Sequence, residues 1–288
     1  MQARTITALG LRARVLEVDG GDHGDPIVLI HGVGGWAETW RAVMRPLAAT
    51  GRRVLALDLP GFGESERPGR VRYFDPKDAF YPSFVLAAMD ELGVRSAHVI
   101  GQSMGGAVAF MTGVSAPART RSLVLVAPGG VGRDVPLFLR LCALPGFGLI
   151  ARLPRSRDAA RDVLATCFHD PGLMTPELIE EAFRYGNASF PEFVRALGHG
   201  VGLRGVRPAL RGAWIARASR HTGPVLVLWG REDRVLPVRH AGAVREVFPH
   251  AEVRLVERCG HLLMAERPDE FLAATLPFLA RAEEAVAA

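Results

Sequence analysis

A serine flanked by glycines is the residue whose position most directly suggests chemistry. Residues 101–105 read Gly-Gln-Ser-Met-Gly, directly after a predicted strand at 98–100 and before a segment with helical spacing. A sharp turn of this kind presents the serine side chain at the carboxyl end of a strand, and a Cβ at either glycine would collide with the neighbouring strand and helix. A serine that only caps a helix would also suit the position, but it would not need both glycines. We therefore predict that Ser103 is a nucleophile.

A serine hydroxyl becomes a good nucleophile when a base takes its proton and a third group orients that base. His261 lies in a glycine loop just beyond the predicted strand 252–256, and Asp233 follows the predicted strand 225–229. The chain order serine, aspartate, histidine, with each member after a separate strand, is typical of hydrolases built on an open α/β sheet. We predict His261 as the base and Asp233 as the acid.

Two other carboxylates could take the place of the acid. Glu232 is adjacent to Asp233 in the chain, but we expect it to point the opposite way, as a surface charge. Asp134 follows the predicted strand 123–126 and is the second position at which the acid could lie. His31, at the end of another predicted strand, is expected to make structural hydrogen bonds.

The elements that must position these residues alternate between strands and helices. Short apolar runs rich in β-branched residues are typical of parallel strands buried on both faces, and helical stretches between them favour an open sheet with right-handed crossovers. The pattern predicts a hairpin over 5–18, strands at 27–30, 54–57, 98–100, 123–126, 225–229 and 252–256, and helices at 38–49, 82–92, 104–115, 239–248 and from 268 onward.

One section breaks this alternation. From residue 129 to 217 the pattern predicts no strand, only helical segments separated by proline and glycine, among them 137–141, 158–168, 176–185 and 191–197. We therefore predict an α/β fold with an open, mostly parallel sheet flanked by helices. Residues 1–128 and 218–288 would form the core, and residues 129–217 an inserted helical cap over the edge where the strands end.

The bulk composition limits the classes of function. The chain has 288 residues, of which 49% are hydrophobic and 23% charged, as expected for a soluble globular protein. The net charge is +5, but the arginines are spread along the whole chain with acids between them, so nucleic-acid binding is not expected. No signal for an oligomeric state is present.

Cysteine usage and apolar runs give the expected location. Three irregularly spaced cysteines predict neither a disulfide framework nor a zinc site and fit a reducing compartment. The first residues lack the apolar region of a signal peptide, and no apolar run approaches the roughly 18 residues that span a bilayer. We expect a cytoplasmic protein without membrane insertion, metal or organic cofactor.

The chain resembles the α/β-hydrolase superfamily, in particular serine hydrolases of the esterase and lipase type with a helical cap. Five segments carry the resemblance, over essentially the whole chain except the cap: His-Gly-Val-Gly-Gly at 31–35, Asp-Leu-Pro-Gly-Phe-Gly-Glu-Ser at 58–65, the turn at 101–105, the acid loop at 230–237 and Gly-His at 260–261. These motifs are specific for the superfamily and say little about the substrate.

Ester hydrolysis passes through an oxyanion that needs preplaced hydrogen-bond donors. One donor is expected from the backbone N–H of Met104, at the start of a helix where free amides and the dipole favour negative charge. The resemblance implies that the other is the N–H of Val33, in a loop where glycines let the backbone come close to the substrate.

Apolar residues around this site favour an ester with a hydrocarbon or aromatic acyl group. Trp36 and Leu262 flank the predicted site, and Phe138 and Phe168 of the cap are expected to contact the substrate, although core packing would explain cap residues equally well. We therefore expect a small-molecule ester as substrate and a carboxylesterase as the activity.

Two alternatives stay open. The cap stretch 168–184 and the segment 258–261 resemble hydrolases that cleave a carbon–carbon bond in vinylogous diketones, the meta-cleavage products. That family usually has Asn before the nucleophile and Trp after the histidine, where this chain has Gln102 and Leu262; Arg184 would be its substrate-carboxylate ligand. The other alternative is a non-catalytic relative that uses the fold to bind a ligand.

Overall fold

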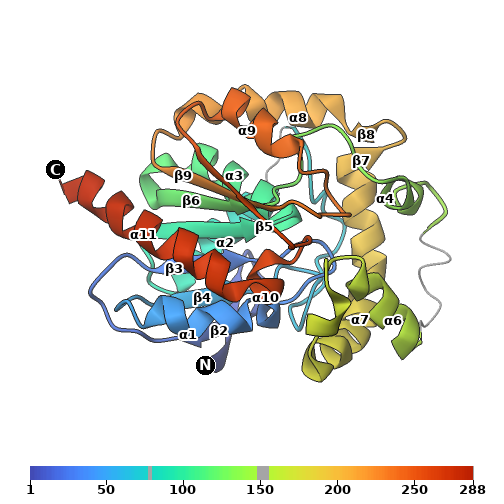
Figure 1. The fold of residues 1–288 in the computed structure, drawn as a ribbon, viewed down its shortest axis with the longest axis horizontal. Coiled ribbons are helices and arrows are strands. Elements are labelled where there is room, and N and C mark those ends of the chain that lie inside the picture. The colour runs from blue at the N-terminus through green and yellow to red at the C-terminus, as the bar shows by residue number, and fades with distance from the viewer. Residues whose placement is uncertain (77–79, 148–155, 288) are drawn as a thin grey trace.

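The computed structural model of the 288-residue chain describes residues 1–76, 80–147 and 156–287. An eight-stranded sheet with the order β1-β2-β4-β3-β5-β6-β9-β10 runs through the molecule (Figure 1). The strands are β1 Gln2–Ala8, β2 Leu11–Val18, β3 Ile27–Ile30, β4 Val54–Leu57, β5 Ala97–Gln102, β6 Thr120–Val126, β9 Val225–Gly230 and β10 Glu252–Val256. The first hairpin is antiparallel, and from β4 to β10 each strand pairs parallel with its neighbour.

The central parallel strands are buried on both faces because their side chains alternate between two hydrophobic clusters. In β3, Val28 and Ile30 belong to one cluster while Ile27 and Leu29 belong to the other. Helices cover both faces: α2 Phe80–Glu91, α3 Met104–Ser115 and α9 His240–Val247 contribute to the first cluster, and α1 Arg41–Ala48, α10 Leu263–Glu266 and α11 Pro268–Ala287 to the second. The predicted fold class, an open and mostly parallel sheet flanked by helices, is confirmed.

The segment between β6 and β9, which we propose to treat as a cap, lies beyond the edge where the parallel strands end (Figure 1). Its described helices are α4 Leu137–Cys142, α6 Arg157–Ala165, α7 Pro176–Gly200 and α8 Pro208–Ile215. Two sequence predictions are corrected here. The short strands β7 Val201–Gly202 and β8 Gly205–Val206 form a hairpin in a region expected to be only helical. The helices predicted at 176–185 and 191–197 are one continuous helix with Pro191 inside it.

None of the helices in the described part of the chain is long and apolar enough to cross a membrane.

A buried ion-pair cluster joins the N-terminal hairpin to the loops at the carboxyl edge of the sheet. The Asp58 carboxylate, fully buried after β4, accepts hydrogen bonds from Arg14 Nε at 2.6 Å and from the backbone N–H groups of Ala37 at 2.7 Å and Glu64 at 2.9 Å. The Arg14 guanidinium also donates to Glu38 at 2.7 and 2.8 Å. Burial disfavours the charged guanidinium, yet these two carboxylates raise the pKa of Arg14 above its ordinary value.

Asp58→Ala should lower the free energy of unfolding by about 3–5 kcal/mol, because it leaves a buried guanidinium without one of its partners. Urea titration followed by circular dichroism measures this. Glu252→Ala is the matched control, because it removes an exposed pair with Arg281 and should change stability by about 1 kcal/mol or less. Equal losses in the two variants would contradict a special role for the buried cluster.

Candidate active site

Ser103 lies at the turn between β5 and α3 in a backbone conformation that side chains rarely adopt. Its φ is 55° and its ψ is −117°, a region costly for a residue with a Cβ. The backbone on both sides is fixed: Ser103 N–H donates to Val126 O at 2.9 Å, and Gly129 N–H donates to Ser103 O at 2.8 Å. The turn therefore holds the serine side chain at the end of the strand, where it is 8% exposed.

The glycines around the turn are required by close backbone contacts. A Cβ on Gly101 would lie 2.1 Å from the carbonyl oxygen of Gly105, and a Cβ on Gly105 would lie 2.2 Å from the carbonyl oxygen of Ile30. Both atoms belong to the backbone and cannot rotate away. Only glycine at these positions lets α3 turn back so tightly against the sheet.

His261 and Asp233 are hydrogen-bonded. His261 Nδ1 lies 2.7 Å from Asp233 Oδ2, and the other carboxylate oxygen accepts the backbone N–H groups of Val235 at 2.7 Å and Leu236 at 2.8 Å. Both oxygens of Asp233 are thus engaged and its orientation is fixed. Since a carboxylate can only accept, Nδ1 carries the proton and Nε2 is the basic nitrogen of the neutral ring.

The competing acids have other partners. Glu232 accepts the backbone N–H of Cys259 at 2.9 Å, and so it supports the histidine loop rather than facing away as a surface charge. Asp134 pairs with Arg239 at 2.6 Å, and its hydrogen bond to this guanidinium lowers the pKa of the carboxyl. The carboxylate that is hydrogen-bonded to His261 is that of Asp233.

His31 makes the structural bonds that were expected of it. Its Nε2 accepts the backbone N–H of Leu59 at 3.0 Å, and its Nδ1 lies 2.7 Å from Gly32 O. Complete burial lowers the pKa of His31, so this imidazole stays neutral and holds the loop after β3 against the loop after β4.

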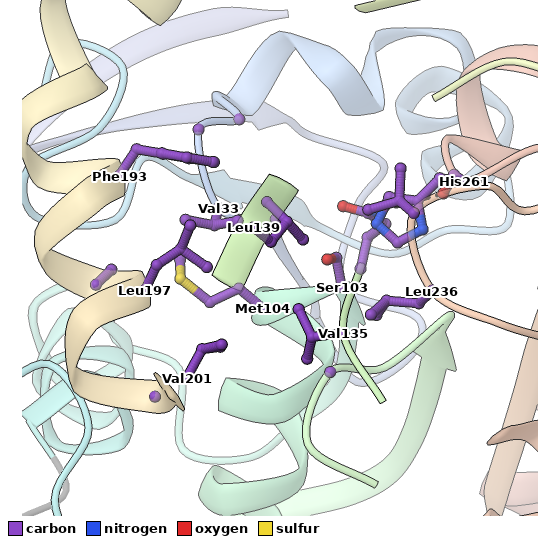
Figure 2. Close-up of a pocket in the computed structure, with 18 of the residues that line it drawn as sticks. Val33, Ser103, Met104, Val135, Leu139, Phe193, Leu197, Val201, Leu236 and His261 are labelled. Carbon is purple, nitrogen blue, oxygen red and sulfur yellow. Dashed lines mark hydrogen bonds between the residues drawn. The ribbon is translucent and has the colours of Figure 1, made fainter. Parts of the chain in front are cut away.

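A cavity of about 450 Å³ opens beside Ser103 and His261. Figure 2 shows that its walls are largely aliphatic and aromatic side chains from the cap and from the edge of the sheet. No arginine or lysine belongs to the wall in residues 1–76, 80–147 and 156–287. A ligand that fits this cavity is therefore apolar over most of its surface.

The two residues predicted to supply oxyanion donors line the same cavity as the serine. Met104 follows Ser103 in the chain, and Val33 comes from the loop after β3 (Figure 2). Met104 is the first residue of α3, so its amide N–H has no acceptor within the helix, and the helix dipole favours negative charge there. Gly34, with a φ of 74°, turns the chain directly after Val33.

Three of the four predicted substrate contacts belong to the cavity wall: Trp36, Phe138 and Leu262. The fourth, Phe168, is corrected by the structure. Its ring is 1% exposed and belongs to the second hydrophobic cluster, not to the wall. The position of Phe168 follows from that of the preceding residue. The carbonyl of Cys167 accepts the N–H groups of His261 and Leu262, and the Phe168 side chain then packs in the core.

Several wall residues were not predicted from the sequence. Phe193, Leu197 and Val201 face the cavity from the end of α7 and the residue that follows it (Figure 2). Their spacing of four residues is the signal that could have identified them. Gln102 was noted only as a departure from a family pattern, but its Nε2 donates to His261 O at 3.1 Å and so connects the serine turn to the histidine loop.

Arg184 lies away from the cavity wall. Its side chain is 67% exposed, pairs with Glu64 at 3.1 Å and stacks on the ring of Tyr185. The structure therefore does not bring the proposed carboxylate ligand to Ser103.

Residues 25–268 match the family described as alpha/beta hydrolase fold. The chain belongs to this family. Its members include relatives of different activity, so membership establishes the architecture, and the activity has to be argued from the residues of the site.

Two curated relatives and one solved structure illustrate the range. The dihydrolipoyllysine-residue acetyltransferase component of the acetoin cleaving system of Cupriavidus necator is 33% identical over 265 residues, covering 91% of this chain and 65% of that protein. This chain thus spans less than two thirds of that relative. A 2-hydroxy-6-oxononadienedioate/2-hydroxy-6-oxononatrienedioate hydrolase of Comamonas testosteroni is 30% identical over 285 residues, 96% of this chain and 95% of that protein. A bacterial membrane phospholipase A superposes with a TM-score of 0.78 and 28% identity, covering 98% of this chain and 86% of that one.

Gly105→Ala should destabilise the protein by about 1–3 kcal/mol or more, because the new methyl group meets the Ile30 carbonyl. Gly212→Ala, in the exposed interior of α8 with open space at its Cβ, is the matched control and should stabilise by about 0.5–1 kcal/mol. Thermal and urea unfolding measure both. A neutral effect of Gly105→Ala would contradict the close approach of α3 to β3.

Proposed function

We propose that this protein is a serine hydrolase that cleaves carboxylic esters with apolar acyl or aryl groups, and that Ser103, His261 and Asp233 form its catalytic triad. One observation carries the proposal: a largely apolar cavity, without arginine or lysine on its described wall, opens beside the strained serine and the histidine–aspartate pair. A neutral ester with a hydrocarbon group matches this wall better than a charged substrate does.

In the proposed reaction, Ser103 Oγ attacks the ester carbonyl while His261 Nε2 takes its proton. Asp233 stabilises the imidazolium through the 2.7 Å bond to Nδ1. The negative charge that develops on the carbonyl oxygen would be bound by the N–H groups of Val33 and Met104.

His261 then protonates the leaving alcohol, which departs as the acyl-enzyme forms. Water attacks the acyl-enzyme with His261 again as base, which releases the acid and restores Ser103. The proposed chemistry needs no metal or organic cofactor.

A second candidate is a carbon–carbon bond hydrolase of the meta-cleavage-product type, favoured by the 30% identity to the Comamonas testosteroni hydrolase over nearly the whole chain. The substrate in that enzyme's name is a dianion. Such a substrate would need cationic partners, and Arg184, the residue that would bind a carboxylate, pairs with Glu64 on the surface. We therefore rank the ester hydrolase first.

A panel of p-nitrophenyl esters from acetate to palmitate tests the proposal. We expect the highest kcat/KM for short or medium acyl chains, because the cavity is apolar but limited in volume, and a loss of about 10³-fold or more in Ser103→Ala. Arg184→Ala should leave ester kinetics unchanged, since its side chain lies outside the cavity.

Wild-type inactivity on every ester would contradict the first proposal. Turnover of a 2-hydroxy-6-oxo-dienoate that Arg184→Ala cripples would move the assignment to the carbon–carbon hydrolase. Turnover of the dienoate is measured as the loss of its visible absorbance. Ser103→Ala is the negative control in both assays.

A further inference from the structure

The loop that carries His261 is held by four consecutive backbone amides. Each donates to an acceptor in another segment: Cys259 to Glu232 Oε2 at 2.9 Å, Gly260 to Glu266 Oε2 at 2.6 Å, and both His261 and Leu262 to the carbonyl of Cys167, at 2.7 and 3.1 Å. The first acceptor lies in the loop of the predicted acid and the second in α10. The last lies in the cap, in the loop 166–170 that follows α6. The cap thus binds the backbone of the histidine itself.

The contact between this cap loop and the histidine loop is too close for any side chain. A Cβ on Gly260 would lie 2.5 Å from Cys167 O and 2.8 Å from His169 N. Glycine at position 260 is therefore a requirement of the contact between the two loops. The buried ring of Phe168 anchors the same cap loop in the hydrophobic core.

Glu266 joins the two loops by a second route. Its side chain is buried, and its two carboxylate oxygens accept N–H groups from different segments: Oε2 from Gly260 at 2.6 Å and Oε1 from Asp170 of the cap loop at 2.8 Å. A buried carboxylate is costly unless charge-assisted hydrogen bonds compensate for lost water. Here those bonds link the cap to the histidine loop, and the side chain does not belong to the cavity wall.

We propose that Glu266 is a positioning residue that couples the cap to catalysis: it holds the cap loop 166–170 against the histidine loop, so that His261 is oriented for proton transfer only while the cap loop is docked. The inference rests on the proposed role of His261 as the base. The cap then has two roles, because it forms much of the cavity wall and its Cys167 carbonyl also accepts the N–H groups of His261 and Leu262.

The test is Glu266→Gln. This substitution keeps the shape of the side chain but replaces one acceptor oxygen by an NH₂ group, which would then face a backbone N–H donor. We expect kcat for p-nitrophenyl butyrate to fall about 10–100-fold, because a small displacement of a catalytic group costs that much. KM should change by about threefold or less, since the cavity wall is untouched. Backbone amides at 259–262 and at 167–170 should exchange hydrogen faster, while those of β5 and β6 keep wild-type rates.

Glu257→Gln is the matched control. Glu257 follows β10 in the segment that leads to His261, is 67% exposed and pairs with Arg231 on the surface, so its loss should change neither kcat nor amide exchange. Phe168→Leu releases the cap loop from its other anchor and should reproduce the kcat loss of Glu266→Gln without touching Glu266. Combining the two variants should cost less than the product of the separate losses, because both break one coupling.

Unchanged kcat in folded Glu266→Gln, or a loss confined to KM, would overturn the inference. So would faster exchange at 259–262 alone, because the two loops would then be independent. Should the wild type hydrolyse no ester, the proposed function fails by itself, and the exchange data still decide whether the cap loop and the histidine loop are coupled.

Discussion

The rest of this structure depends on one strained backbone position, the turn at Ser103. A serine at a φ of 55° costs of order 1–3 kcal/mol, and such a conformation persists only where the surrounding structure determines it. Two backbone hydrogen bonds, to Val126 at the end of β6 and from Gly129 just beyond it, hold this turn against the neighbouring strand. The same turn fixes where α3 begins, and so it places the helix N-terminus and the serine side chain at one point.

The other site loops are arranged around this turn by close backbone approach. Glycines at 105 and 260 let α3 reach the end of β3 and let the cap loop reach the histidine loop. Hydrogen bonds from backbone N–H groups to carboxylates then connect the loops to one another. Asp58 binds the loop after β3, and Glu232 and Glu266 bind the amides before His261. Short-range packing and hydrogen bonding thus give the histidine–aspartate pair a fixed geometry beside the serine.

The sequence was informative wherever a residue's place followed from a nearby buried strand. Ser103, Asp233 and His261 each lie in a loop that follows a predicted strand, so their convergence at one edge of the sheet could be predicted from strand order. The helix at 104–115 was predicted with its observed bounds, because the glycine-flanked serine turn marks its start and Pro117 follows its end.

The cap was less predictable, because its contacts join residues far apart in the chain. Phe168 was expected in the cavity, but the bond from Cys167 to the histidine loop directs it into the core. Pro191 was expected to begin a second helix, yet α7 continues through it, with buried residues on both sides of the proline. The residues around Glu266 in the sequence would suggest an exposed charge. They do not indicate that its side chain accepts the backbone N–H of Asp170, which is 96 residues away in the chain.

The claim that Ser103 is an activated nucleophile can be tested most directly by incubating the folded protein with a fluorophosphonate probe and locating the adduct by peptide mass spectrometry. A single adduct on Ser103, absent from unfolded protein and strongly slowed in His261→Ala, is the predicted result. The reagent reacts only with a serine whose proton a base can take, so a non-catalytic ligand-binding relative would remain unlabelled. Folded protein without an adduct on Ser103 would contradict the account.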